Sequence, residues 1–111
     1  MMVKPIAVLT RDRSPSLPTL ASAPEQGLTD LQASNGFAFF LPKGTPAAIV
    51  ERLHDATVAT MDAPAIQLRM REIGAELVIP ERRSSEYLQK FVEIEIEKLA
   101  APIKASGGAI N

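Results

Sequence analysis

The 111-residue sequence predicts an α/β fold with three short buried strands packed with three main helices. Two patterns carry this prediction. Three short apolar runs, at residues 6–9, 36–41 and 77–79, are bounded by proline or glycine and resemble strands buried on both faces. Elsewhere, apolar residues recur every three or four positions, which is the period of an amphipathic helix. The length fits one domain with a modest core.

The run at residues 36–41 contains three of the four phenylalanines, so we expect it to anchor the core. Residues 10–29 contain three prolines and many polar side chains, which predicts a long loop. Inside this loop, Ser22 and Glu25 have the spacing of a capping box, in which a hydroxyl and a carboxylate satisfy backbone donors of one helical turn. Gly27 is expected to stop that turn.

Capping residues place the first two helices. Thr45 is expected to cap a helix whose first residue is Pro46 and which continues to about residue 61. A second, shorter helix restarts near Pro64 and should end at Gly74, since glycine readily adopts the left-handed conformation that follows many helices.

The third helix is expected to begin after Ser84, its N-cap, and to be kinked or ended at Pro102. Glu95 falls near the middle of its apolar face, where a carboxylate needs a partner. We interpret Glu95 as a structural clamp to a loop such as the one bearing Arg11 and Arg13, with Arg13 as the named partner. The alternative is a carboxylate that transfers a proton or binds a ligand.

Composition excludes several functions. The net charge of −1 gives no attraction to nucleic acid, and the absence of cysteine excludes disulfides and thiolate chemistry. His54 is the only histidine and has no nucleophile motif beside it, so we predict no catalytic residue, no metal site, no cofactor and no enzyme activity. His54 is expected at the border of the first helix's apolar face. The rival interpretation is a small enzyme that uses His54 and Glu95.

The candidate ligand-binding residues are Ser34, Asn35 and Phe37. The first two precede the second predicted strand and offer donors to an anion, while the phenylalanine could wall a pocket. An ordinary turn followed by a core strand is the alternative.

Four motifs keep the order and spacing of one protein family, and their positions cover almost the whole chain. They are Arg13-Ser-Pro-Ser-Leu-Pro18, Glu25-Gln-Gly-Leu28, Leu41-Pro-Lys-Gly-Thr-Pro46 and Ile73-Gly-Ala-Glu-Leu77. Together they resemble the C-terminal portion of the Bug family, the extracytoplasmic solute receptors of tripartite tricarboxylate transport systems. The stretch around Asn35 departs from the family pattern.

This resemblance implies part of one lobe of a two-lobed periplasmic binding protein. Its implied function is binding small organic anions, such as carboxylates, for uptake together with membrane transporter subunits, and its implied location is the periplasm. Residues 1–111 are then expected to form a single truncated domain that binds such anions weakly or not at all. The alternative is an interaction domain that forms a homo-oligomer or docks on another chain.

The N-terminus has no basic segment followed by a long apolar stretch. We therefore predict no signal peptide in this chain, and a cytoplasmic location if it is expressed as written.

Overall fold

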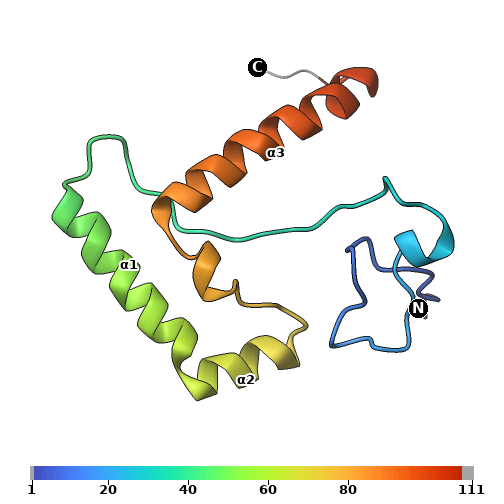
Figure 1. Cartoon of the computed structure of the whole chain (residues 1–111), viewed down its shortest axis with the longest axis horizontal. Coiled ribbons are helices and arrows are strands. Elements are labelled where there is room, and N and C mark those ends of the chain that lie inside the picture. The colour runs from blue at the N-terminus through green and yellow to red at the C-terminus, as the bar shows by residue number, and fades with distance from the viewer. Residues whose placement is uncertain (1, 109–111) are drawn as a thin grey trace.

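The computed structural model describes residues 2–108, and its regular secondary structure is helical. Residues 1 and 109–111 of the predicted domain lie outside this description. Figure 1 shows the N-terminal loop, residues 8–27, at one side, α1 (Ala47–Asp62) and α2 (Pro64–Glu72) at the other, and α3 (Ser85–Ala105) above them. The elements are η1 (Pro24–Gln26), α1 (Ala47–Asp62), α2 (Pro64–Glu72), η2 (Pro80–Arg82) and α3 (Ser85–Ala105).

The predicted α/β fold is wrong, because no strand forms within residues 2–108. The first apolar run contributes only an isolated parallel bridge between Val8 and Ser22. Residues 36–41 and 77–79 form neither a strand nor a bridge, and no two of the three runs pair with each other. A strand exists only where a neighbour completes its hydrogen bonds, and the described part of the chain supplies no such neighbour.

The three predicted helices form close to their expected positions. Ser84 caps α3 as predicted, accepting a hydrogen bond from the Tyr87 backbone N–H at 3.1 Å. Gly74 follows α2 with φ of 73°, a left-handed conformation that a side chain would strain. At the start of α1 the prediction is wrong by one residue, because the N-cap is Pro46 and not Thr45. The Thr45 hydroxyl donates to the Pro42 carbonyl at 2.7 Å and accepts no hydrogen bond from the helix.

The third helix passes through Pro102 and ends at Ala105, so this proline does not terminate it. Since proline has no N–H, α3 lacks one hydrogen bond of its ladder at this point. The turn after Pro102 is closed by the Ser106 N–H, which donates to the Pro102 carbonyl at 3.0 Å. The last turn therefore forms despite the missing donor.

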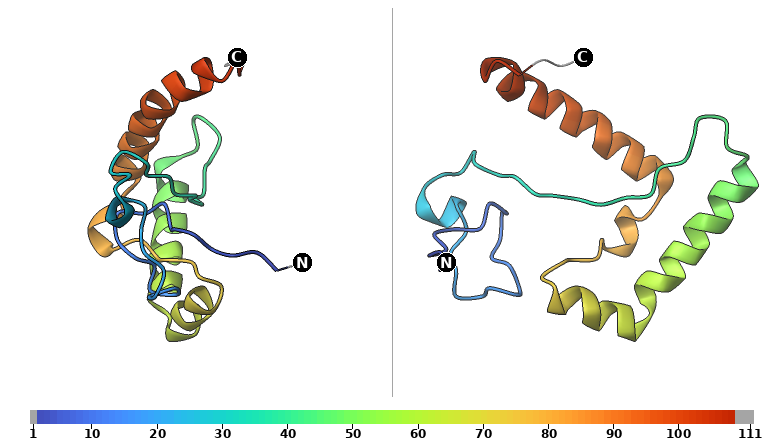
Figure 2. Two further views of the ribbon diagram at one scale, coloured as in Figure 1. Left: turned by 90° about the vertical axis from the view of Figure 1, so that its right-hand side faces the viewer. Right: turned by 180° about the vertical axis from the view of Figure 1, so that it is seen from behind.

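The molecule is open, as the two further views show (Figure 2). Its radius of gyration is 17.2 Å, whereas a compact domain of this length has about 13 Å. Within residues 2–108, the buried side chains are Ser22 and Ala23, so the predicted core around residues 36–41 is absent. Among the described elements, α1 and α2 make the most extensive contact.

No helix within residues 2–108 combines the length and the apolar character needed to cross a membrane.

Candidate functional site

The N-terminal loop, defined as residues 8–27, contains the two side chains that are buried within residues 2–108. Its centre is an ion pair in which the Arg13 guanidinium donates to both carboxylate oxygens of Glu25, with Nε 3.0 Å from each and Nη2 2.9 Å from Oε1. Arg13 Nη1 also donates to the Pro18 carbonyl at 3.2 Å. The Arg13 guanidinium thus holds two other residues of the loop, Pro18 and Glu25, close to Arg13.

The predicted capping box is present in the same loop. The Ser22 backbone N–H donates to Glu25 Oε2 at 2.8 Å, and the Glu25 N–H donates to the Ser22 hydroxyl at 3.4 Å. Gly27 ends the turn with φ of 92°, as expected. The same carboxylate therefore serves both the helical turn and Arg13.

These contacts change the acidity of the carboxylate. Hydrogen bonds from Arg13, and next from the Ser22 N–H, lower the pKa of Glu25 from 4.5 to about 2. Each bond favours the charged form over the neutral one. Because every partner is a group of the loop itself, the perturbed carboxylate has a structural explanation and gives no evidence for catalysis.

The structure does not bring Arg13 and Glu95 together. Glu95 receives a hydrogen bond from Lys98 at 3.4 Å on the same helix, and its side chain is 30% exposed. The desolvation that motivated a clamp is therefore only partial. Arg13 has a different carboxylate partner, Glu25, within its own loop.

The candidate ligand residues Ser34, Asn35 and Phe37 lie on an extended segment that joins the N-terminal loop to α1 (Figure 1). All three are exposed, and the phenylalanine is 96% exposed. In the part of the chain that the structure describes, no backbone hydrogen bond joins them to another candidate residue. Their role in ligand binding stays a prediction.

A second cluster joins α1 to the region before α3, and its central residue, Arg83, is not among the residues predicted to carry a role. His54 Nε2 donates to the Arg83 carbonyl at 2.9 Å, since a carbonyl only accepts. The Arg83 side chain donates to Asp62 at 2.7 Å and to the Val78 carbonyl at 2.9 Å. It is only 11% exposed. In the sequence, Arg83 is marked only by its place in a basic turn after Pro80. That pattern does not reveal a contact with Asp62, 21 positions earlier.

The His54–Arg83 cluster borders an open hollow of about 330 Å³. In this hollow one ring nitrogen of His54 bonds to the Arg83 backbone carbonyl, and the other lies 3.4 Å from a carboxylate oxygen of Asp55, its neighbour on α1. This geometry supports a role for His54 in holding elements together. The hollow is lined by His54, Val58, Asp62, Pro80, Arg83 and Ser84.

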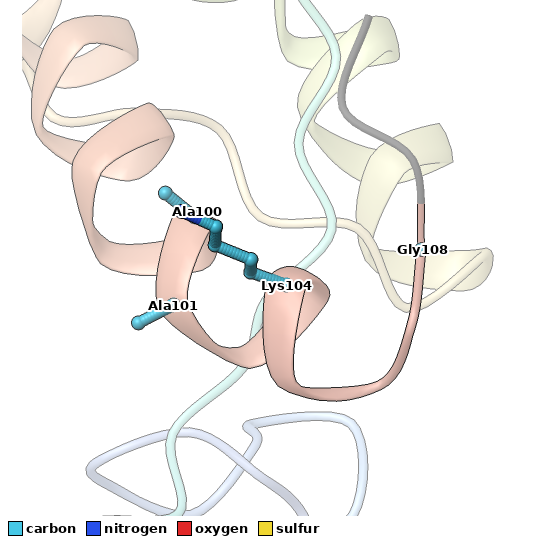
Figure 3. Close-up of a pocket in the computed structure, with 4 residues that line it drawn as sticks. All are labelled: Ala100, Ala101, Lys104 and Gly108. Carbon is cyan, nitrogen blue, oxygen red and sulfur yellow. The ribbon is translucent and has the colours of Figure 1, made fainter.

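A third feature is an open hollow of about 410 Å³ at the end of α3, lined by Ala100, Ala101, Lys104 and Gly108 (Figure 3). Among residues 2–108, Lys104 is the one charged side chain in its lining. A single flexible ammonium group on an open surface does not define a ligand site. Within residues 2–108, no group of three or more histidine, cysteine, aspartate or glutamate side chains is placed to hold a metal ion.

Comparison with known proteins explains this arrangement. Residues 2–107 match the sequence model of the tripartite tricarboxylate transporter family receptor. The chain belongs to this receptor family. The Bug resemblance predicted from the four motifs is thereby confirmed, and the match is to binding proteins rather than enzymes, as expected.

Two curated relatives illustrate the match. The chain is 32% identical over 101 residues to a protein of the TAR-I ttuE-ttuC' intergenic region of Agrobacterium vitis, covering 91% of this chain and 29% of that protein. It is 26% identical over 109 residues to BugT of Bordetella pertussis, covering 98% of this chain and 32% of BugT. The chain thus spans about a third of the length of these relatives.

A solved structure, described as that of the periplasmic binding protein BugD, superposes with a TM-score of 0.79 at 32% identity. The match covers 91% of this chain and 33% of BugD. The open arrangement of helices and loops is therefore that of one part of a periplasmic receptor of this family.

Proposed function

We propose that these residues form part of a solute receptor that binds a small organic anion, such as a carboxylate, for uptake. The observation that carries the proposal is the family match over residues 2–107, which is supported by the superposition with BugD. Uptake would take place through the membrane subunits of a tripartite tricarboxylate transporter, and the receptor would work in the periplasm. Residues 1–111 would serve as a truncated domain within that function.

The 111-residue chain by itself binds such an anion weakly or not at all. Ligand sites for small molecules bury 70–90% or more of the ligand, and they do so in concave pockets. Here Ser34, Asn35 and Phe37 lie exposed on one extended segment, so donors from other parts of a receptor are needed to surround a ligand.

Asn35 is the candidate whose chemistry fits an anion best, because its amide group offers two donors. Together with the Ser34 hydroxyl it could bind a carboxylate oxygen from one side. Phe37 would then supply an apolar wall next to these donors.

A chimera tests this function. The chain would replace the matched third of BugD, and calorimetric titration with di- and tricarboxylates would be compared with titration of the isolated chain. We expect micromolar binding of at least one acid to the chimera and none to the chain alone. A folded chimera that binds no acid, or an isolated chain that binds one with micromolar affinity, would contradict the proposal.

Within the chimera, Asn35→Asp places a negative charge beside the anion, while Gln32→Asp adds the same charge three residues earlier. Asn35→Asp should weaken binding by on the order of tenfold or more, because like charges repel at close range. Gln32→Asp should have a much smaller effect. Equal effects of the two variants would exclude Asn35 from the site.

A further inference from the structure

The surface of this chain is too large for a molecule that works uncovered. Its accessible surface is 9709 Å², whereas a compact monomer of 12.0 kDa exposes roughly 6,000 Å². The excess of about 3,700 Å² is more than four times the roughly 800 Å² that each partner contributes to a standard protein interface. Interfaces this large are typical of obligate complexes, whose partners stay bound to each other.

The extended segment at residues 36–41 is the most exposed apolar part of that surface. Phe37, Phe39 and Phe40 are 96%, 72% and 70% exposed. In an extended chain, alternate side chains point to opposite faces, so Phe37 and Phe39 share one face and Phe40 lies on the other. Both faces are therefore apolar, as in a strand inside a sheet that is covered on both sides.

The backbone of this segment is equally incomplete. No backbone hydrogen bond within residues 2–108 involves residues 34–41. Flanking bonds exist, since the Ala33 N–H donates to the Leu9 carbonyl and the Thr45 N–H donates to the Pro42 carbonyl. The unpaired run is thus long enough for a strand and bounded by ordered residues, which makes it a template for pairing with strands of another polypeptide.

From these observations we infer that residues 36–41 become an inner strand of a sheet supplied by the remainder of a receptor of this family, and that the chain associates with that remainder even when the two are separate polypeptides. This inference rests on the proposed function. The superposition covers a third of BugD, so two thirds of such a receptor are available as the cover.

A second copy of this chain fits the surface less well. A symmetric dimer buries one self-complementary patch on each copy. Exposed apolar residues instead occur on both faces of the 36–41 segment and on all three helices, for example Ile49, Leu68 and Ile96. A single patch cannot cover all of them, and residues 2–108 of a second copy contain no sheet that the segment could join.

Co-expression of the chain with BugD lacking its matched third tests the inference without any ligand. We expect a one-to-one complex in size-exclusion chromatography with light scattering. In hydrogen exchange, the amides of residues 36–41 should exchange at least about tenfold more slowly in the complex than in the free chain.

Phe39→Asp should weaken this complex by on the order of thirtyfold, the effect of losing an interface anchor. Gln32→Asp is the matched control, with the same added charge on an exposed polar position of the same connecting segment, and should change the affinity less than threefold. Circular dichroism of the free variants should show unchanged helix content, because neither residue lies in a helix.

The inference fails if no complex forms, if the chain forms only a homodimer, or if the two variants weaken the complex equally. Its failure is distinct from failure of the proposed function. A chimera that binds carboxylates while the separate pieces do not associate would overturn the inference alone. A one-to-one complex together with a chimera that binds no acid would overturn the function alone.

Discussion

The N-terminal loop and the extended segment at residues 36–41 have opposite properties. The loop is rich in polar residues and proline, yet it contains the two residues that are buried within residues 2–108, Ser22 and Ala23, and a dense set of hydrogen bonds. The segment is the most aromatic part of the chain, yet it is exposed and unpaired. The loop is ordered by partners within 20 residues of each other, whereas an apolar strand needs neighbours that can lie anywhere in a sequence.

The largest effect is expected from removing the carboxylate at the centre of the loop. Glu25→Ala removes the carboxylate partner of Arg13 and the acceptor of the Ser22 N–H together, so the protection of the Val8 and Ala23 amides against hydrogen exchange should be lost. Asp30→Ala, which removes an exposed carboxylate just outside the loop, serves as the control. Retained protection in Glu25→Ala would mean that the backbone bonds alone hold the loop.

Acid should open the same loop in a defined range. The pKa of Glu25 is about 2 in the folded loop and 4.5 ordinarily, so its stabilising effect is complete above about pH 4.5 and falls as the pH drops toward 2. The Ser22 amide proton and the Glu25 carboxyl carbon should report this transition by NMR. Glu25→Gln should abolish it. A midpoint near 4.5 would show that the ion pair does not form in solution.

A smaller effect is expected at the N-terminus of α3. Ser84→Ala removes the hydroxyl that accepts from the Tyr87 N–H, and loss of such a cap costs about 1 kcal/mol of helix stability. Thermal unfolding followed by circular dichroism should show the decrease. Ser85→Ala is the matched control, because Ser85 is the first residue inside the helix. Equal melting of the two variants would argue against capping by Ser84.

The smallest effect is expected from Phe39→Ser in the isolated chain. In a packed core, truncating a phenylalanine costs about 3–5 kcal/mol. Here the side chain is 72% exposed, so the free energy of unfolding should change by less than about 0.5 kcal/mol. Chemical denaturation followed by circular dichroism provides the measurement. A large loss of stability would show that the free chain packs this segment into a core.

The sequence by itself determined the features that depend on near neighbours. The capping box of Ser22 and Glu25, the Ser84 cap and the stop at Gly74 could be predicted because a side chain and the backbone it bonds are only a few positions apart. The spacing of the four motifs also indicated the receptor family, which the match over residues 2–107 confirmed.

Only the tertiary structure decided which distant groups meet. Glu95 had the pattern of a buried carboxylate, but its exposure and its bond to Lys98 depend on whether another element covers α3. Likewise, residues 36–41 have the composition of a buried strand, and none of the described residues pairs with them. The composition of a segment shows whether it can be buried. Burial itself requires a second surface, and residues 2–108 do not provide one for residues 36–41.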